Sequence, residues 1–182
     1  MITLTNIRNV EQAGVTWTQV ESVKAQVVAR TGHRDPYYLT REDLEPILAY
    51  KLRSQRNRTE HHRRGWTEER VPAVTSATFG VRLEDVDLES RARASILTSL
   101  PGVGIAVASA ILALVEPERY GIIDFRNWRQ LFPSARRTFS VDNYCEYMAK
   151  LRDLSDQLQW PVQRVEWCIW EYDRTTNPID DE

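Results

Sequence analysis

The stretch LPGVGIAVASAILALVEPERYGIIDFRNWRQLF, Leu100 to Phe132, decides the fold and the function that the chain suggests. Two glycines lie in a short apolar turn, and the alanine-rich run over 105–115 is typical of a closely packed helix. A single acid, Asp124, then stands behind two isoleucines at the start of another short helix, predicted to run to Phe132. The stretch therefore predicts two helices joined by a tight turn, followed by a carboxylate that acts chemically, caps the next helix, or does both.

The turn itself has the features of a phosphate-binding element. Pro101 ends the preceding helix, which we expect to run from an Asp87 cap to Ser99. Glycines permit positive φ and the close approach of another chain, and the first amides of the following helix have no partners within it. Those amides and the helix dipole favour one phosphate. The residues predicted to contact DNA here are Leu100, Pro101, Gly102, Val103, Gly104 and Ala106. The alternative is a plain turn that binds nothing.

This pattern resembles the helix-hairpin-helix DNA glycosylase superfamily, the relatives of endonuclease III and of adenine glycosylases. In that family an LPGVG turn is followed, about twenty residues later, by a catalytic aspartate behind two apolar residues, and Asp124 stands twenty residues after Gly104. The helical patterns along the chain, with almost no regular β alternation, predict an all-α fold. The resemblance implies a compact helical bundle of two small lobes with a DNA-binding cleft between them. We expect one glycosylase-like domain over 1–182, with the motif at about 88–115, and the residues NPIDDE indicate an acidic tail at about 174–182.

The resemblance also implies a reaction. Cleavage of an N-glycosidic bond leaves positive charge on the sugar, which a fixed carboxylate stabilises, or the carboxylate deprotonates water. Asp124 then makes the protein a monofunctional DNA glycosylase of base excision repair, which flips a damaged or modified base from double-stranded DNA and hydrolyses its bond. The bland alternative is a helix cap, which stabilises by about 1 kcal/mol.

Two departures from the family pattern matter. Its bifunctional members carry a lysine two residues after the second glycine, where this chain has Ala106, so strand cleavage by the family's lysine is not expected. The only cysteines, Cys145 and Cys168, are too few for a four-cysteine iron–sulfur cluster, and we expect no metal or cofactor. The first departure also allows a non-catalytic helix-hairpin-helix protein that recognises damaged or distorted DNA. A third alternative is a helical structural protein.

A basic segment precedes the turn. Six basic residues and one acid lie from Lys51 to Arg64, a net charge of +5, at the end of a helix predicted from a Thr40 cap to about Gln55. By resemblance, Gln55 fills the gap left by a flipped base. Among the predicted phosphate contacts of this segment are Arg53, Arg56 and Arg58. The alternative is a solvated, charged helix end.

Aromatic side chains supply candidates for a base pocket. Stacking on an extruded base needs such rings. The candidates are Tyr37, Tyr38 and Trp128, whereas the other aromatic residues of the C-terminal third are expected in the core.

The bulk properties set the remaining limits. The net charge is −2, so any DNA contact must come from a local basic patch rather than from the whole surface. No apolar run approaches the roughly 20 residues of a membrane span, and the N-terminus lacks a signal-peptide pattern. We therefore expect a cytoplasmic monomer without a membrane partner. The other helices predicted are Val15–Arg30, capped by Thr18 with Glu21, then Thr67–Phe79, one from Ser140 to about Gln159, and one from Pro161 to about Tyr172.

Overall fold

A computed structural model describes residues 1–14, 17–57 and 60–178, and in these ranges the chain is helical without a strand. The all-α prediction is therefore confirmed. The helices are α1 (Leu4–Gln12), α2 (Thr18–Thr31), α3 (Arg41–Leu52), α4 (Arg70–Gly80), α5 (Val86–Leu97), α6 (Ile105–Val115), α7 (Phe125–Leu131), α8 (Val141–Leu158) and α9 (Val162–Thr176). Two short 3₁₀ helices, η1 (Arg53–Gln55) and η2 (Glu60–Arg63), follow α3.

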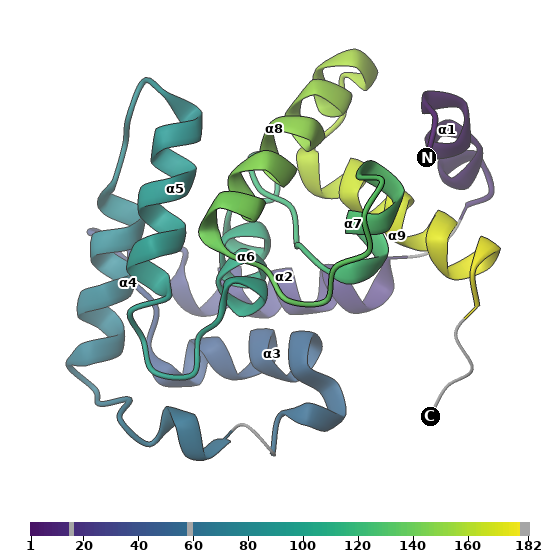
Figure 1. The fold of residues 1–182 in the computed structure, drawn as a ribbon. Coiled ribbons are helices and arrows are strands. Elements are labelled where there is room, and N and C mark those ends of the chain that lie inside the picture. The colour runs from purple at the N-terminus through teal and green to yellow at the C-terminus, as the bar shows by residue number, and fades with distance from the viewer. Residues whose placement is uncertain (15–16, 58–59, 179–182) are drawn as a thin grey trace.

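Helix α6 is the centre of the molecule. Figure 1 shows it between α4 and α5 on one side and α7 and α9 on the other, with α2 and α3 beneath. It contacts α2, α3, α5 and α8, and every side chain from Val107 to Leu114 is buried. Alanines at every second or third position keep this helix thin, so four neighbours can approach it closely. The predicted bounds, 105–115, are those observed.

Three predicted N-caps are confirmed. Thr40 caps α3 in a reciprocal capping box with Asp43, Ser140 caps α8, and Asp124 caps α7. The hydroxyl of Thr67 accepts a hydrogen bond from the amide of Arg70, at the start of α4. These short polar side chains satisfy amides that the helix itself leaves without partners.

Two predicted caps were wrong. Asp85, not Asp87, caps α5, because its Oδ1 accepts from the amides of both Asp87 and Leu88, so the helix begins at Val86. Thr18 already belongs to α2, whose first turn is preceded by Trp17 without a side-chain cap. Where several acids or hydroxyls stand together, residue type alone therefore does not identify the cap.

Other boundaries also differ from the predictions. Helix α3 ends at Leu52 rather than Gln55, because Arg53 takes a positive φ of 46° and the chain turns into η1. Helix α9 runs through Thr176, so the first residues of the predicted acidic tail are helical. Helix α1, which the sequence did not predict, packs on α9. None of the described helices is long and apolar enough to cross a membrane.

Candidate active site around Asp124

The turn between α5 and α6 packs against the segment that follows η1. A Cβ at Gly102, where φ is +78°, would lie 2.8 Å from the Cβ of His62 and 3.3 Å from the Cγ of Arg63. The indole Nε1 of Trp66 donates to the Pro101 carbonyl at 2.8 Å. The space beside Gly102 is thus filled by the protein's own chain, which corrects the expectation that both glycines leave room for DNA.

Gly104 is the open position of this turn. Among the described residues, nothing lies within 4 Å of a Cβ placed there, and Gly104 has no side chain to cap α6. Leu100 and Val103 are buried, at 1% and 4% exposed, so their side chains belong to the core rather than to a DNA-binding surface. Pro101 and Ala106 remain partly exposed. Any close approach of a phosphodiester therefore centres on Gly104 and the first amides of α6.

Asp124 stands at the end of a buried extended segment, where the chain enters α7. Its Oδ1 accepts a hydrogen bond from the amide of Asn127 at 3.0 Å. The carboxylate is therefore a helix cap, as one of the two interpretations required. Because a cap fixes the side chain, it also mounts the carboxylate in one orientation.

The backbone of Ile123, the residue before Asp124, is held by side chains of two helices. The amide of Ile123 donates to the Ser109 hydroxyl of α6 at 3.1 Å. The carbonyl of Ile123 accepts from Lys51 Nζ of α3 at 3.2 Å. A buried backbone group that lacked such partners would be costly, so these two side chains explain how an extended segment crosses the core.

The carbonyl of the preceding residue, Ile122, is held by two more side chains. Ile122 O accepts from the Tyr147 hydroxyl at 2.9 Å and from Asn127 Nδ2 at 3.2 Å. Burial raises the pKa of the Tyr147 phenol well above its usual value, which keeps the phenol protonated and able to donate. The segment leading to Asp124 is thus tied to α3, α6, α7 and α8.

Gly121 lets this segment approach α8 and α9. A Cβ at Gly121 would collide with Leu151 Cδ1 of α8 and would lie 3.2 Å from the Cβ of Glu166 on α9. The role of Gly121 could not be predicted from the sequence, because it depends on neighbours thirty and forty-five residues away.

Two ionisable side chains, Glu166 and Lys51, interact electrostatically with Asp124. Glu166 is 5% exposed and accepts from Asn127 Nδ2 at 2.8 Å. Burial, and next the charge of Asp124, raises the pKa of Glu166 to about 8. Burial lowers the pKa of the Lys51 amine, against the opposing effect of Asp124 and Glu166. At neutral pH the cluster therefore holds a protonated carboxyl and a desolvated amine around the Asp124 site.

Sequence reasoning missed this cluster. Lys51 was counted only as the start of the basic segment, yet its amine turns inward to Ile123. Glu166 stands among Val165, Trp167 and Cys168, and a lone acid in such an apolar run is the signal that could have found it. The partner of that acid, Asn127, could not be inferred because it lies on another helix.

The predicted phosphate contacts are only partly exposed. Arg53 and Gln55 are exposed in η1, directly after the helix that carries Lys51. Arg56 forms an ion pair with Glu45, and its carbonyl accepts from Arg63 Nη2 at 2.9 Å. Arg58 lies outside the described residues. The basic segment is therefore less uniformly available to phosphates than its sequence suggests.

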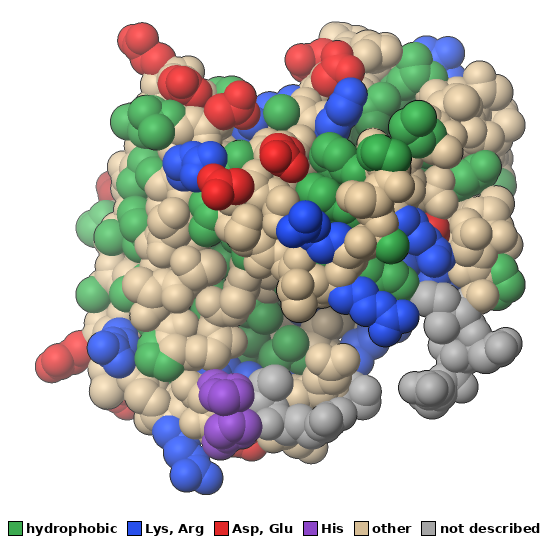
Figure 2. Space-filling model, in the orientation of Figure 1, with side chains coloured by type: hydrophobic (Ala, Val, Ile, Leu, Met, Phe, Trp, Pro, Cys, Tyr) green, Lys and Arg blue, Asp and Glu red, His purple; other side chains and the backbone are tan. Residues whose placement is uncertain are grey.

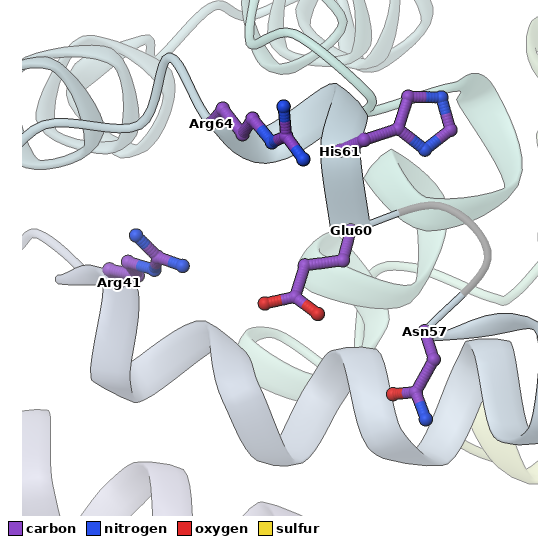
Figure 3. Close-up of a pocket in the computed structure, with 5 residues that line it drawn as sticks. All are labelled: Arg41, Asn57, Glu60, His61 and Arg64. Carbon is purple, nitrogen blue, oxygen red and sulfur yellow. The ribbon is translucent and has the colours of Figure 1, made fainter.

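An open pocket of about 520 Å³ lies beside this segment. Figure 3 shows Arg41, at the start of α3, and Glu60 reaching toward the same space below Arg64. The remaining lining residues are Asn57 and His61. On the face drawn in Figure 2, Lys and Arg side chains gather near the middle and lower right, and Asp and Glu toward the top. Although the net charge of the protein is −2, one face carries a basic area.

Trp128 is buried in the core. It is 3% exposed, stacks on Phe132 with ring centroids 4.1 Å apart, and lies 5.4 Å from the ring of Phe139. Its proposed role in base binding was wrong, because α7 turns this ring into the core.

Tyr37 and Tyr38 also lie away from Asp124. The Tyr37 hydroxyl shares a hydrogen bond with Thr31 at 3.0 Å, and the Tyr38 ring lies beneath the guanidinium of Arg34. Both tyrosines precede the first turn of α3, whereas Lys51 is in its last turn, about 16 Å along the axis at 1.5 Å per residue. Tyr37 and Tyr38 therefore lie at the opposite end of α3 from the amine that reaches Ile123, whereas Trp128 lies in the helix that Asp124 caps.

Comparisons with known proteins add no relative. No family model matches the chain, and no curated protein and no solved structure matches it. Among the described residues, no group of three or more His, Cys, Asp or Glu side chains is arranged to hold a metal ion.

Proposed function

We propose that this protein is a monofunctional DNA glycosylase in which Asp124 stabilises the positive charge on the sugar, or activates water, as the glycosidic bond breaks. The observation that carries the proposal is the mounting of Asp124. Its carboxylate caps α7, and the two peptide groups before it are held by side chains of α3, α6, α7 and α8. Electrostatic catalysis requires such a charge to be fixed before the substrate arrives.

In this proposal α5, the turn and α6 form a helix-hairpin-helix motif that binds the backbone of double-stranded DNA. Gly104 and the first amides of α6 take one phosphate, and exposed arginines such as Arg53 and Arg64 take others. The duplex lies in a cleft between two small lobes, and Gln55 fills the space of the flipped base. The protein acts as a monomer, and water is the nucleophile that leaves an abasic site.

The test is a panel of duplex oligonucleotides, each carrying one altered base, assayed for released base. We expect one of them to be a substrate, and Asp124→Asn to slow its release at least about a hundredfold. Asparagine caps helices as well as aspartate does, so α7 should persist and duplex binding should be retained. The matched control is Asp153→Asn, the same change at an exposed position of α8.

A second function, DNA recognition without catalysis, is favoured by one observation: Ala106 stands where the bifunctional members of the family carry a lysine. If no duplex releases more base with the native chain than with Asp124→Asn, the enzyme proposal is wrong. Salt-dependent duplex binding without release then supports the recognition protein. If binding is absent as well, a structural role remains.

A further inference from the structure

The open pocket beside η2 is lined by charged side chains from two separate parts of the chain. Its volume is about 520 Å³, within the range of roughly 300–1,000 Å³ that is usual for small-molecule sites. Arg41, at the start of α3, and Arg64, directly after η2, both line it, and Glu60 of η2 reaches toward the same space (Figure 3). The pocket therefore brings two guanidinium groups and one carboxylate to a space that is open to a ligand.

Both walls of this pocket are held by buried contacts. On α3, Asp43 is 2% exposed and completes the capping box at the helix start, next to Arg41. On the other side, Arg63 precedes Arg64, is 4% exposed, and donates to the Arg56 carbonyl at 2.9 Å. Arg41 and Arg64 thus extend from backbone that the core fixes, so a ligand that binds them orders side chains rather than loops.

The charged side chains of the pocket are not neutralised by one another. Within the described ranges, the side chains of Arg41, Glu60 and Arg64 form no hydrogen bond and no ion pair, although opposite charges line the same space. Arg56, in the same basic segment, is by contrast paired with Glu45. Two arginines and one glutamate leave a net charge of +1 at the pocket, which favours an anionic ligand.

A nucleotide fits this set of charges. A phosphomonoester carries about −1.5 to −2 charges at neutral pH, and guanidinium groups bind phosphate oxygens in pairs. The carboxylate of Glu60 only accepts hydrogen bonds, so it needs an N–H or O–H of the same ligand and disfavours a bare phosphate. Nucleotides carry such donors on the sugar and the base, and the Asn57 amide, which also lines the pocket, can both donate and accept.

We propose that this pocket binds a nucleoside monophosphate group, with Arg41 and Arg64 on its phosphate and Glu60 on a donor of its sugar or base. The group belongs either to a free nucleotide or to the 5′-phosphorylated end of a DNA strand. The site goes beyond the proposed function, because it requires no reaction at Asp124 and uses Arg41, which the proposed duplex contacts do not include.

The test is calorimetric titration of the full chain with guanosine 5′-monophosphate, with guanosine and with inorganic phosphate. We expect the nucleotide to bind at least about tenfold more tightly than either of its parts, and Arg41→Gln to weaken it at least about tenfold, because a charge-assisted contact is lost. Arg8→Gln, the same change at an exposed position of α1, should leave the affinity unchanged. Glu60→Gln should strengthen the binding of inorganic phosphate and reduce the preference for the nucleotide.

Two DNA duplexes that differ only in a 5′-phosphate distinguish the two sources of the group. Tighter binding of the phosphorylated duplex, lost in Arg41→Gln, identifies a strand end, whereas nucleotide binding without that difference identifies a free nucleotide.

Three outcomes overturn the proposal: the native chain binds neither the nucleotide nor the phosphorylated end preferentially, guanosine binds as tightly as its monophosphate, or Arg41→Gln binds as the native chain does. Arg41 is exposed, circular dichroism checks that the variant is folded, and Arg64→Gln provides a second substitution. Asp124→Asn should lose base release yet bind the nucleotide as the native chain does, so this site and the proposed function can fail separately.

Discussion

The segment from Gly121 to Asn127 and the segment from Arg53 to Arg64 are both parts of the proposed site, but they are built differently. In the first, backbone carbonyls are held by Lys51, Tyr147 and Asn127 inside the core. In the second, Arg53 and Arg64 are exposed, Arg56 is paired with Glu45, and Arg63 is buried. The difference teaches that buried polar contacts position the carboxylate, whereas the proposed phosphate contacts would depend on exposed charge.

The largest expected effect on the free energy of unfolding comes from replacing Glu166, which removes an ionisable group from beside the buried segment. Because the pKa of Glu166 is raised from 4.5 to about 8 on folding, its protonated form stabilises the fold. That stability is complete below about pH 4.5 and is lost as pH rises toward 8. Glu166→Gln, which stays neutral and can still accept from Asn127, should therefore raise the free energy of unfolding at pH 9 by on the order of 4 kcal/mol.

The measurement is urea unfolding of the native chain and of Glu166→Gln at pH 5, 7 and 9. The two should differ little at pH 5, and the gap should widen with pH. The control is Glu146→Gln, an exposed acid of α8. A gap that stays constant from pH 5 to pH 9 contradicts the raised pKa.

An intermediate effect on the free energy of unfolding is expected at Gly121. Its size measures how closely the buried segment is packed. Gly121→Ala places a methyl group against Leu151 and Glu166, both buried, so overpacking should cost about 1–3 kcal/mol of unfolding free energy. Thermal and urea unfolding measure the loss. Gly104→Ala is the matched control, since its Cβ enters open space, and equal losses at the two glycines would contradict the packing described here.

The smallest effect on the free energy of unfolding is expected in the basic segment. There we expect a change in the salt dependence of DNA binding instead. Arg64 is exposed beside the open pocket, so Arg64→Gln should change the unfolding free energy by less than about 0.5 kcal/mol. If Arg64 contacts a phosphate, the slope of log binding constant against log salt concentration should fall by roughly 1. The measurement is duplex binding at salt concentrations between about 50 and 200 mM. Arg8→Gln, an exposed arginine of α1, should leave the slope unchanged.

Local patterns predicted much of the fold. The bounds of α6 and the caps at Thr40, Asp124 and Ser140 follow from residues close in sequence, so they could be predicted from the chain alone. The Asp85 cap was missed because two nearby acids compete locally, and the positive φ of Arg53 has no strong sequence signal. Among the predicted base-pocket residues, Trp128 failed because helix phase turned its ring inward.

The sequence by itself determined the helical class, the turn before the helix over 105–115, and Asp124 as a cap, because each depends on propensity, periodicity or capping over a few residues. Only the tertiary structure decided what surrounds Asp124. Lys51 and Glu166 come from α3 and α9, and their pKa shifts arise chiefly from burial, which exists only when those helices pack on the segment around Ile123. Gly102 likewise faces His62 rather than open space, because contact between distant segments is set by packing of the whole chain.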